Sequence, residues 1–208
     1  MFITFEGLDF CGKSTQVELL KNYFEASEKK VEIIREPGGT EISEKIRDIL
    51  LDKKNTEMTI ESELLLFSSS RAQLVREKII PLLEKGYYVI SDRFHDSSIA
   101  YQGYGRGISI NSVKEIQYFA INGAIPNITF FIDVPFEEIS RRRLNHGENN
   151  LDRIELSENE FYRNVYRGYL ELCEAEDRIK KIDGTKSIEE VHQQIINEIK
   201  TLENLERK

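Results

Sequence analysis

Residues 7–15 read Gly-Leu-Asp-Phe-Cys-Gly-Lys-Ser-Thr and match the phosphate-binding P-loop pattern G-x-x-x-x-G-K-[ST]. Residues 1–5 before this stretch are apolar and β-prone, which is typical of a buried strand. After it, apolar residues recur at helical spacing between 17 and 24. A strand, a glycine-rich loop and a helix in this order turn backbone N–H groups and the positive end of the helix dipole toward a bound anion. The stretch therefore predicts a site for nucleotide phosphates.

The P-loop supplies the first candidate residues. Lys13 can reach the terminal phosphates of a nucleotide, and the Ser14 hydroxyl can bind Mg²⁺. A chance match at a strand–helix turn is the alternative, which the strand and helix on either side disfavour. The whole loop is expected to surround the phosphates, so the expected cofactor-binding residues are Gly7, Leu8, Asp9, Phe10, Cys11, Gly12, Lys13, Ser14 and Thr15.

Asp92 and Arg93 follow directly after the apolar run 87–91 and form a second signal. In a P-loop protein, an acidic residue at this place can hold Mg²⁺ through water. An arginine there can bind a phosphate through two N–H groups. The alternative is a surface ion pair at the end of the strand, but ligands of parallel sheets bind at the ends of such strands.

Apolar runs alternate with amphipathic stretches along the rest of the chain. The expected strands after the first are 31–35, 87–91, 128–132 and 179–182. The expected later helices are 42–50, 60–84, 111–121, 136–144, 157–176 and 187–202. We therefore predict a single α/β domain over residues 1–208, with a doubly wound, five-stranded parallel sheet flanked by helices.

Local signals refine the helix limits. Pro81 is expected to bend the helix 60–84, because proline cannot donate a backbone hydrogen bond. Ser157 with Glu160, and Ser187 with Glu190, have the spacing of capping boxes at helix starts.

The composition restricts the classes of partner. The chain of 208 residues has a net charge of −8, which argues against a general nucleic-acid or membrane surface. Its apolar runs fall short of the ~20 residues that span a membrane, and Glu6 and Asp9 do not fit a signal peptide. Cys11 and Cys173 are the only cysteines, so a reducing, cytoplasmic setting is expected.

Cys11 precedes a helix start and lies next to Gly12-Lys13. Positive potential at this place predicts a lowered thiol pKa and a reactive thiolate. The alternative is a buried, inert cysteine, since free cysteines are commonly buried.

Four stretches carry a further pattern. They are 5–9 (Phe-Glu-Gly-Leu-Asp) with the P-loop, 35–40 (Arg-Glu-Pro-Gly-Gly-Thr), 92–98 (Asp-Arg-Phe-His-Asp-Ser-Ser) with 100–103 (Ala-Tyr-Gln-Gly), and 152–155 (Asp-Arg-Ile-Glu). Taken together, they resemble the thymidylate kinase family, whose members phosphorylate dTMP with ATP. They occur in the family's order and extend over most of the chain. The resemblance implies a P-loop nucleoside monophosphate kinase with a mobile lid at about 144–156, a homodimer, dTMP and ATP as substrates, and Mg²⁺.

The resemblance also implies roles around the sugar and the acceptor phosphate. Asp9 is expected to accept a hydrogen bond from the 3′-hydroxyl. Tyr101 is expected to crowd the sugar where a ribose carries its 2′-hydroxyl. Arg47 and Arg93 are expected to bind the acceptor phosphate, with Glu36 positioned nearby.

Further residues are expected around the base. Phe67 and Arg71 lie four residues apart on the expected helix 60–84, so both face the same side. By resemblance, Phe67 stacks on the base and Arg71 donates to a base carbonyl, while Ser97 and Gln102 hydrogen-bond the base edge. Without the resemblance, Phe67 fits a core residue and Arg71 fits a surface residue.

Some members of the family carry a catalytic arginine in the P-loop, and others carry arginines in the lid. Phe10 occupies the P-loop position here, where small residues are usual in the lid-arginine branch, so the lid is expected to supply the charge. Arg153 is the first candidate, with Arg141 and Arg143 behind it, and Arg142 is expected to stack on adenine. The alternative for the basic run is a solvated helix end. The expected catalytic residues are Lys13, Arg93, Arg153 and Asp9.

Other functions fit parts of the pattern. A deoxynucleoside kinase needs a carboxylate that activates a neutral 5′-hydroxyl, and Glu36 can serve there. Another nucleoside monophosphate kinase, and an inactive nucleotide sensor, are further alternatives. A GTP-dependent switch is disfavoured because, outside the P-loop itself, the sequence has no D-x-x-G after a strand and no N-K-x-D motif.

Overall fold

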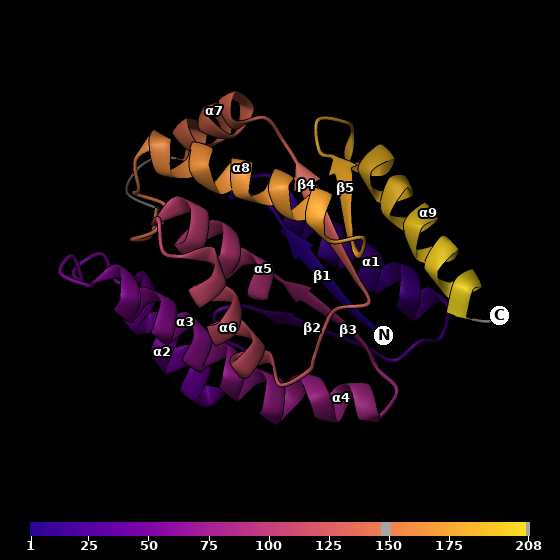
Figure 1. The fold of residues 1–208 in the computed structure, drawn as a ribbon. Helices are drawn as coiled ribbons and strands as arrows, with labels where there is room; N and C mark the ends of the chain where they lie inside the picture. The colour runs from indigo at the N-terminus through magenta and orange to yellow at the C-terminus, as the bar shows by residue number, and fades with distance from the viewer. Residues whose placement is uncertain (147–150, 207–208) are drawn as a thin grey trace.

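Five parallel strands form one sheet in the order β2-β3-β1-β4-β5 in the computed structural model, which describes residues 1–146 and 151–206 (Figure 1). Strand β1 lies between β3 and β4, so the P-loop leaves from the centre of the sheet. The predicted five-stranded parallel sheet flanked by helices is confirmed. The strands are β1 (Phe2–Glu6), β2 (Val31–Arg35), β3 (Tyr88–Asp92), β4 (Ile128–Asp133) and β5 (Ile179–Asp183).

Helices cover both faces of this sheet (Figure 1). Helices α1 (Lys13–Ala26) and α9 (Ile188–Glu206) pack together against one face, and α8 (Asn159–Ala175) lies on the other. In the described ranges, no helix has the length and apolar character needed to cross a membrane. The remaining helices before residue 146 include α2 (Glu41–Leu51), α3 (Ile60–Leu74), α5 (His95–Ser98), α6 (Ile110–Ile121) and α7 (Phe136–His146).

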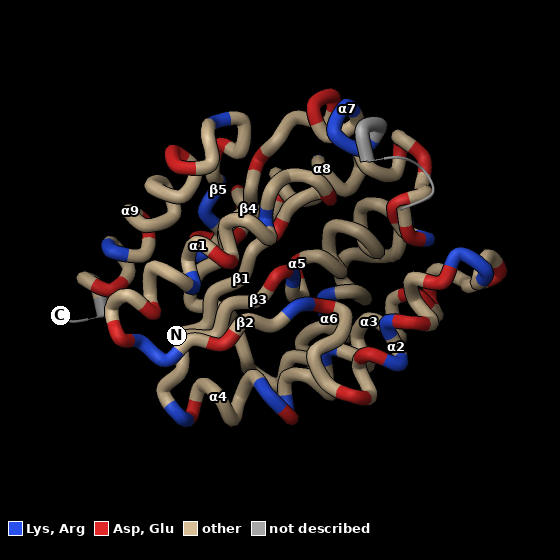
Figure 2. The backbone as a smooth tube through the Cα atoms, turned by 180° about the vertical axis from the view of Figure 1, so that it is seen from behind, with Lys and Arg blue, Asp and Glu red and all other residues tan. Residues whose placement is uncertain are grey.

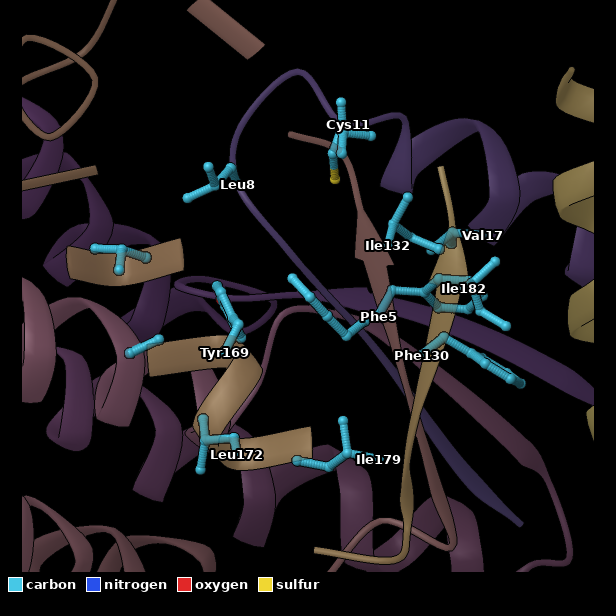
Figure 3. Packing of buried hydrophobic residues seen from close by; sticks show 14 of the residues in the cluster. Phe5, Leu8, Cys11, Val17, Phe130, Ile132, Tyr169, Leu172, Ile179 and Ile182 are labelled. Atoms are coloured by element: carbon cyan, nitrogen blue, oxygen red, sulfur yellow. The ribbon is translucent and has the colours of Figure 1, made fainter. Parts of the chain in front are cut away.

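The central strands are apolar because both of their faces are covered. Every residue of β1 is buried, and its apolar side chains reach two core clusters, Ile3 and Phe5 in one and Phe2 in the other. Phe5 packs with Phe130 in the cluster that also contains Val17 of α1 (Figure 3). Phe2 packs with Phe94 in the other cluster. The buried hydroxyls of Thr4 and Thr129 satisfy each other across the strands at 2.7 Å.

The expected helix 60–84 is divided into three parts. After α3, a π-helical turn spans Val75–Ile79, and α4 follows at Ile80–Glu84. Pro81 lies in the first turn of α4, where its missing N–H is tolerated. The helix was expected to bend at Pro81. It is instead interrupted by the π-helical turn, which comes before the proline.

A helical segment that the sequence did not predict follows β3. Helix α5 continues directly into a π-helical turn at Ile99–Gly105. This turn packs closely on α8, since a Cβ atom at Gly105 would lie 2.6 Å from Phe161. Its i→i+5 hydrogen bonding does not follow the 3.6-residue repeat, which explains why periodicity missed it.

One of the two expected capping boxes is confirmed. The Ser187 N–H donates to Glu190 Oε2 at 3.0 Å, and the Glu190 N–H donates to Ser187 Oγ at 3.2 Å. The box at Ser157 is wrong, because α8 begins at Asn159 after Glu158 and has no side-chain cap.

We expect Leu20→Ala to lower the free energy of unfolding by about 2–5 kcal/mol, since it removes a side chain from the core beneath α1. Leu205→Ala, at a side chain that is 64% exposed, is the matched control and should cost less than about 0.5 kcal/mol. Urea unfolding of the two variants measures both values. Equal losses would contradict this description of the core.

Candidate active site

A cavity of about 660 Å³ opens at the carboxyl ends of the strands. The structure brings most of the predicted residues into its wall, although they come from segments far apart in the sequence. Gly7, Leu8, Cys11 and Arg153 are not in the wall. The predicted residues that line it are Asp9, Phe10, Gly12, Lys13, Ser14, Thr15, Glu36, Arg47, Phe67, Arg71, Asp92, Arg93, Ser97, Tyr101, Gln102 and Arg142.

The P-loop curls around its own lysine. Lys13 Nζ donates to the carbonyl oxygens of Gly7 at 3.1 Å and Leu8 at 2.9 Å. Gly7 has φ 143°, and a Cβ atom there would lie 3.0 Å from the Ile132 carbonyl oxygen, so only glycine fits. Phe10 has φ 67°, which is unusual for a bulky residue and places its side chain at the cavity wall.

The two expected Mg²⁺ ligands lie side by side. Ser14 Oγ donates to Asp92 Oδ2 at 2.9 Å. A hydroxyl and a carboxylate are hard oxygen ligands, and Mg²⁺ characteristically binds one or two protein oxygens plus phosphates and water. Within the described chain no cluster of three His, Cys, Asp or Glu residues could hold a metal. This pair therefore fits Mg²⁺ bound together with a nucleotide.

Arg93 lies at the end of β3 with φ 69°, a conformation that directs its side chain back toward the P-loop. Its guanidinium donates to Asp9 Oδ1 at 2.6 Å and to Tyr101 Oη at 3.0 Å. Burial raises the pKa of the Asp9 carboxyl, but the charges of Arg93 and Lys13 outweigh burial and lower that pKa overall. Asp9 is therefore an anion that can accept a hydrogen bond from a ligand hydroxyl.

Glu6, which the sequence analysis missed, is linked to Arg93 through two hydroxyl groups. Glu6 accepts from Ser97 Oγ at 2.6 Å and from Tyr169 Oη at 2.8 Å. Arg93 Nη1 donates to the same two hydroxyl oxygens, to Ser97 Oγ at 3.1 Å and to Tyr169 Oη at 3.4 Å. Ser97, expected at the base edge, lies at the cavity wall with its hydroxyl engaged here. The available signal was a lone acid at the end of an apolar strand, Glu6.

Arg71 is buried, with only 1% of its side chain exposed, so the surface alternative is excluded. Its five N–H groups all have acceptors in the protein. Nε donates to Glu36 at 2.6 Å, Nη1 donates to Ser98 Oγ at 2.8 Å and to Gln117, and Nη2 donates to the Phe94 carbonyl at 3.0 Å and contacts Glu36. A base carbonyl that reaches Arg71 would have to share one of these groups.

Glu36 is the other half of this buried pair. Burial raises its pKa to about 7, although the charge of Arg71 acts in the opposite direction. Its Oε2 is bound by Arg71, whereas Oε1 has no hydrogen-bond partner in the described part of the chain. Glu36 lines the cavity, but this oxygen is itself buried.

Arg47 and Phe67 complete the wall next to this pair. Arg47 Nη1 donates to the Pro37 carbonyl at 2.8 Å, which leaves other N–H groups for an anion. Phe67 is half-buried: it packs on the core and also faces the cavity. Both of its predicted environments are therefore present at once.

The arginines around the expected lid separate into different environments. Arg142 lines the cavity and donates to the Phe10 carbonyl at 3.2 Å. Arg141 is exposed and pairs with Glu138, and Arg143 lies over the Tyr162 ring at 5.3 Å. The tube coloured by charge shows this basic run on α7 (Figure 2). Residues 147–150 of the expected lid lie outside the described residues.

Arg153 does not face the phosphate side in this structure, contrary to the expectation from sequence. It donates to Glu63 Oε2 at 2.7 Å and to the Leu50 carbonyl at 2.7 Å. The segment that carries it is fixed locally, because Asp152 Oδ1 accepts from the N–H groups of Ile154 and Glu155, each at 2.8 Å. Glu63 lies 90 residues earlier in the chain, so no local pattern identified this partner.

The expectation of a reactive Cys11 is wrong. The residue is 3% exposed, and its side chain lies in the core beneath the loop (Figure 3). Burial raises the pKa of the Cys11 thiol and outweighs the opposing charges of Lys13 and Arg93. The thiol is therefore neutral and shielded, which is the alternative that the sequence left open.

Comparison with known proteins gives a consistent result. Residues 5–195 match the family described as thymidylate kinase. The thymidylate kinase of Thermosipho africanus is 50% identical over 195 residues, which cover 94% of this chain and 95% of that protein. That of Kosmotoga olearia is 48% identical over 202 residues, 95% and 94% of the two chains. The crystal structure of thymidylate kinase from Ehrlichia chaffeensis has a TM-score of 0.78 and 34% identity, covering 96% of this chain and 98% of that chain.

We expect neither cysteine to react with iodoacetamide at pH 7 in the folded protein. Cys11 is buried, and burial raises the pKa of Cys173 to about 11. In urea both should be labelled, since unfolding exposes both thiols. Peptide mass spectrometry measures the two sites separately, and rapid native labelling at Cys11 would contradict its placement.

Proposed function

Because the chain belongs to the thymidylate kinase family, we propose that it transfers the γ-phosphoryl group of ATP to the 5′-phosphate of dTMP, giving dTDP for dTTP synthesis. The observation that carries this proposal is one cavity whose wall contains several cationic side chains. Lys13 of the P-loop lines it together with Arg47 and Arg93 from two other segments. Two phosphate-bearing molecules fit such a cavity better than one.

The reaction requires positioning and charge neutralisation more than proton transfer. An oxygen of the dTMP phosphate forms a bond to the γ-phosphorus while the bond from that phosphorus to the β,γ-bridging oxygen breaks. The acceptor phosphate has a second pKa of about 6, so it is already an effective nucleophile at neutral pH. Lys13 and the P-loop N–H groups hold the donor, and Arg47 and Arg93 hold the acceptor.

Mg²⁺ belongs to the proposal because its two candidate ligands are already adjacent. Ser14 and Asp92 would hold it, directly and through water respectively. When bound, it would supply positive charge against the phosphate oxygens. Arg142 is proposed for the adenine side, where its planar group can stack.

The nucleoside of dTMP is proposed to lie against Phe67. Asp9 accepts from the 3′-hydroxyl, and Tyr101, held by Arg93, limits the space beside the sugar. Gln102 faces the base edge, and Glu36 keeps Arg71 in place at the end of the pocket.

A deoxynucleoside kinase is the second candidate, and one observation favours it. The unpartnered Oε1 of Glu36, with a pKa of about 7, fits a general base for a neutral 5′-hydroxyl. Arg47 and Arg93 in the same cavity support a phosphate-bearing acceptor instead.

We propose a homodimer in the cytoplasm. Large apolar side chains are exposed on neighbouring helices, Leu65 of α3 at 56% and Phe119 of α6 at 80%. Such an apolar face is typical of an interface. Both cysteines are free, which suits a reducing compartment.

We expect ADP release with dTMP, weaker release with dUMP, and release with dCMP lower by on the order of tenfold or more, because mismatched buried hydrogen-bonding groups are costly. A coupled assay with ATP, Mg²⁺ and a panel of nucleosides and monophosphates measures this. Thymidine as the better acceptor would favour the deoxynucleoside kinase, and no turnover with any acceptor would favour an inactive sensor.

We expect Arg153→Ala to lower kcat by about 10²-fold with little change in the KM for dTMP, if Arg153 leaves Glu63 to meet the transferring phosphoryl group. Lysine at this position should recover part of the rate, since it lacks the planar fork. Arg167→Ala, at an exposed arginine paired with Glu171 on α8, is the control. Near-normal kcat in Arg153→Ala, Arg141→Ala and Arg143→Ala alike would refute a lid arginine.

A further inference from the structure

Glu63 of α3 is buried directly behind the base side of the cavity. Its side chain is 2% exposed, and it does not line the cavity itself. Three side chains from other segments converge on it. Gln102 Nε2 donates to Oε1 at 3.0 Å, Arg106 donates to both oxygens at 3.1 and 3.2 Å, and Arg153 donates to Oε2 at 2.7 Å.

Glu63 is an anion in this environment. Burial raises the pKa of its carboxyl, but the hydrogen bonds and charge of Arg106, with the contacts of Gln102 and Arg153, lower that pKa overall. An ionised carboxylate only accepts hydrogen bonds. The Gln102 side chain must therefore turn its NH₂ group toward Glu63, which fixes the direction of an amide that could otherwise be flipped.

Fixing the NH₂ group also fixes the other end of the amide. Gln102 lines the cavity, and its carbonyl oxygen has no hydrogen-bond partner in the described part of the chain. Glu63, Phe67 and Arg71 recur at four-residue spacing on one side of α3, so this acceptor lies on the same side of the cavity as Phe67. The N–H groups of Arg71 are already committed to protein acceptors.

We propose that Glu63 is a positioning residue that determines base selectivity: by fixing the Gln102 amide, it presents an acceptor that selects a pyrimidine carrying an N3–H. Thymine and uracil have this donor, whereas neutral cytosine has a lone pair at N3. The proposal rests on the proposed function in placing the base against Phe67 and Gln102. A site built to accept from an N–H strongly disfavours an analogue without it.

The buried charge of Glu63 does not need its contact with Gln102 in order to be stabilised. Arg106 binds both carboxylate oxygens and by itself neutralises the buried charge. A purely structural role for Glu63 is therefore met by Arg106, and loss of that role would reduce turnover of all substrates together. The orienting role instead predicts a change in the ratio between substrates.

The test compares kcat/KM for dTMP, dUMP and dCMP in the wild type and in Glu63→Gln. The neutral amide at 63 can donate or accept, so Gln102 loses its fixed direction. We expect the dTMP-to-dCMP ratio to fall by about tenfold, with dUMP following dTMP. Glu61→Gln, at an exposed residue on the same helix, is the matched control and should keep the wild-type ratio. An unchanged ratio in Glu63→Gln would overturn the proposal.

A reciprocal variant provides a rescue. In Glu63→Gln combined with Gln102→Glu, the amide at 63 donates to the new carboxylate, whose other oxygen again faces the base as an acceptor. We expect the double variant to regain dTMP selectivity even if its rate stays low. Failure to exceed the single variant in selectivity would count against the proposal.

Two provisions keep the result decisive. If Glu63→Gln does not fold, Glu63→Asp takes its place, since it keeps the charge beside Arg106 but withdraws the carboxylate from Gln102 by one methylene. The rise in melting temperature caused by dTMP and by dCMP is measured for every variant. If the wild type has no kinase activity, the proposed function fails, while the two melting shifts still decide the role of Glu63.

Discussion

The contact between Arg93 and Asp9 depends on the register of two neighbouring strands, and most of the site depends on that contact. Strands β1 and β3 pair with Phe5 opposite Asp92, so the P-loop and Arg93 leave the sheet at the same level. The arginine then reaches Asp9 at 2.6 Å and forms a second link to Glu6 through Ser97 and Tyr169. A slip of one residue in β3 would turn Arg93 to the other face and separate these charges.

A similar constraint governs the buried arginine of α3. Moving a charge out of water costs several kcal/mol unless its partners replace the lost hydration. Arg71 meets this condition with acceptors from the loop after β2, from α5 and from α6, which ties three separate elements to one guanidinium. Helix α6 thereby contributes Gln117 to the support of the site, beyond its packing on α3.

The sequence predicted the features that depend on local pattern. Apolar runs located the strands, the P-loop spacing located Lys13 and Ser14, and a charged pair after a strand located Asp92 and Arg93. The π-helical turn after α5 was missed because its repeat is not 3.6 residues. The resemblance assigned roles to substrate residues that line one cavity in the structure, but it gave no information on the contacts between them.

Features that depend on burial or on distant partners could not be read from the sequence. The neighbours of Cys11 suggested a thiolate, yet burial outweighs their charge. Arg153 was assigned by its place in a motif, but its partner Glu63 comes from another part of the chain. Glu6 was given no role in the site, although four donors converge on it.

The curled P-loop has a consequence for nucleotide affinity. Lys13 already donates to the Gly7 and Leu8 carbonyls, so these carbonyls compete with any bound anion for the lysine. A single small anion offers little more than those carbonyls and gains little by displacing them. A polyphosphate would have to replace them, but the N–H groups at the start of α1 would offer it further contacts. The geometry of the loop therefore favours a longer, more highly charged ligand over a small anion.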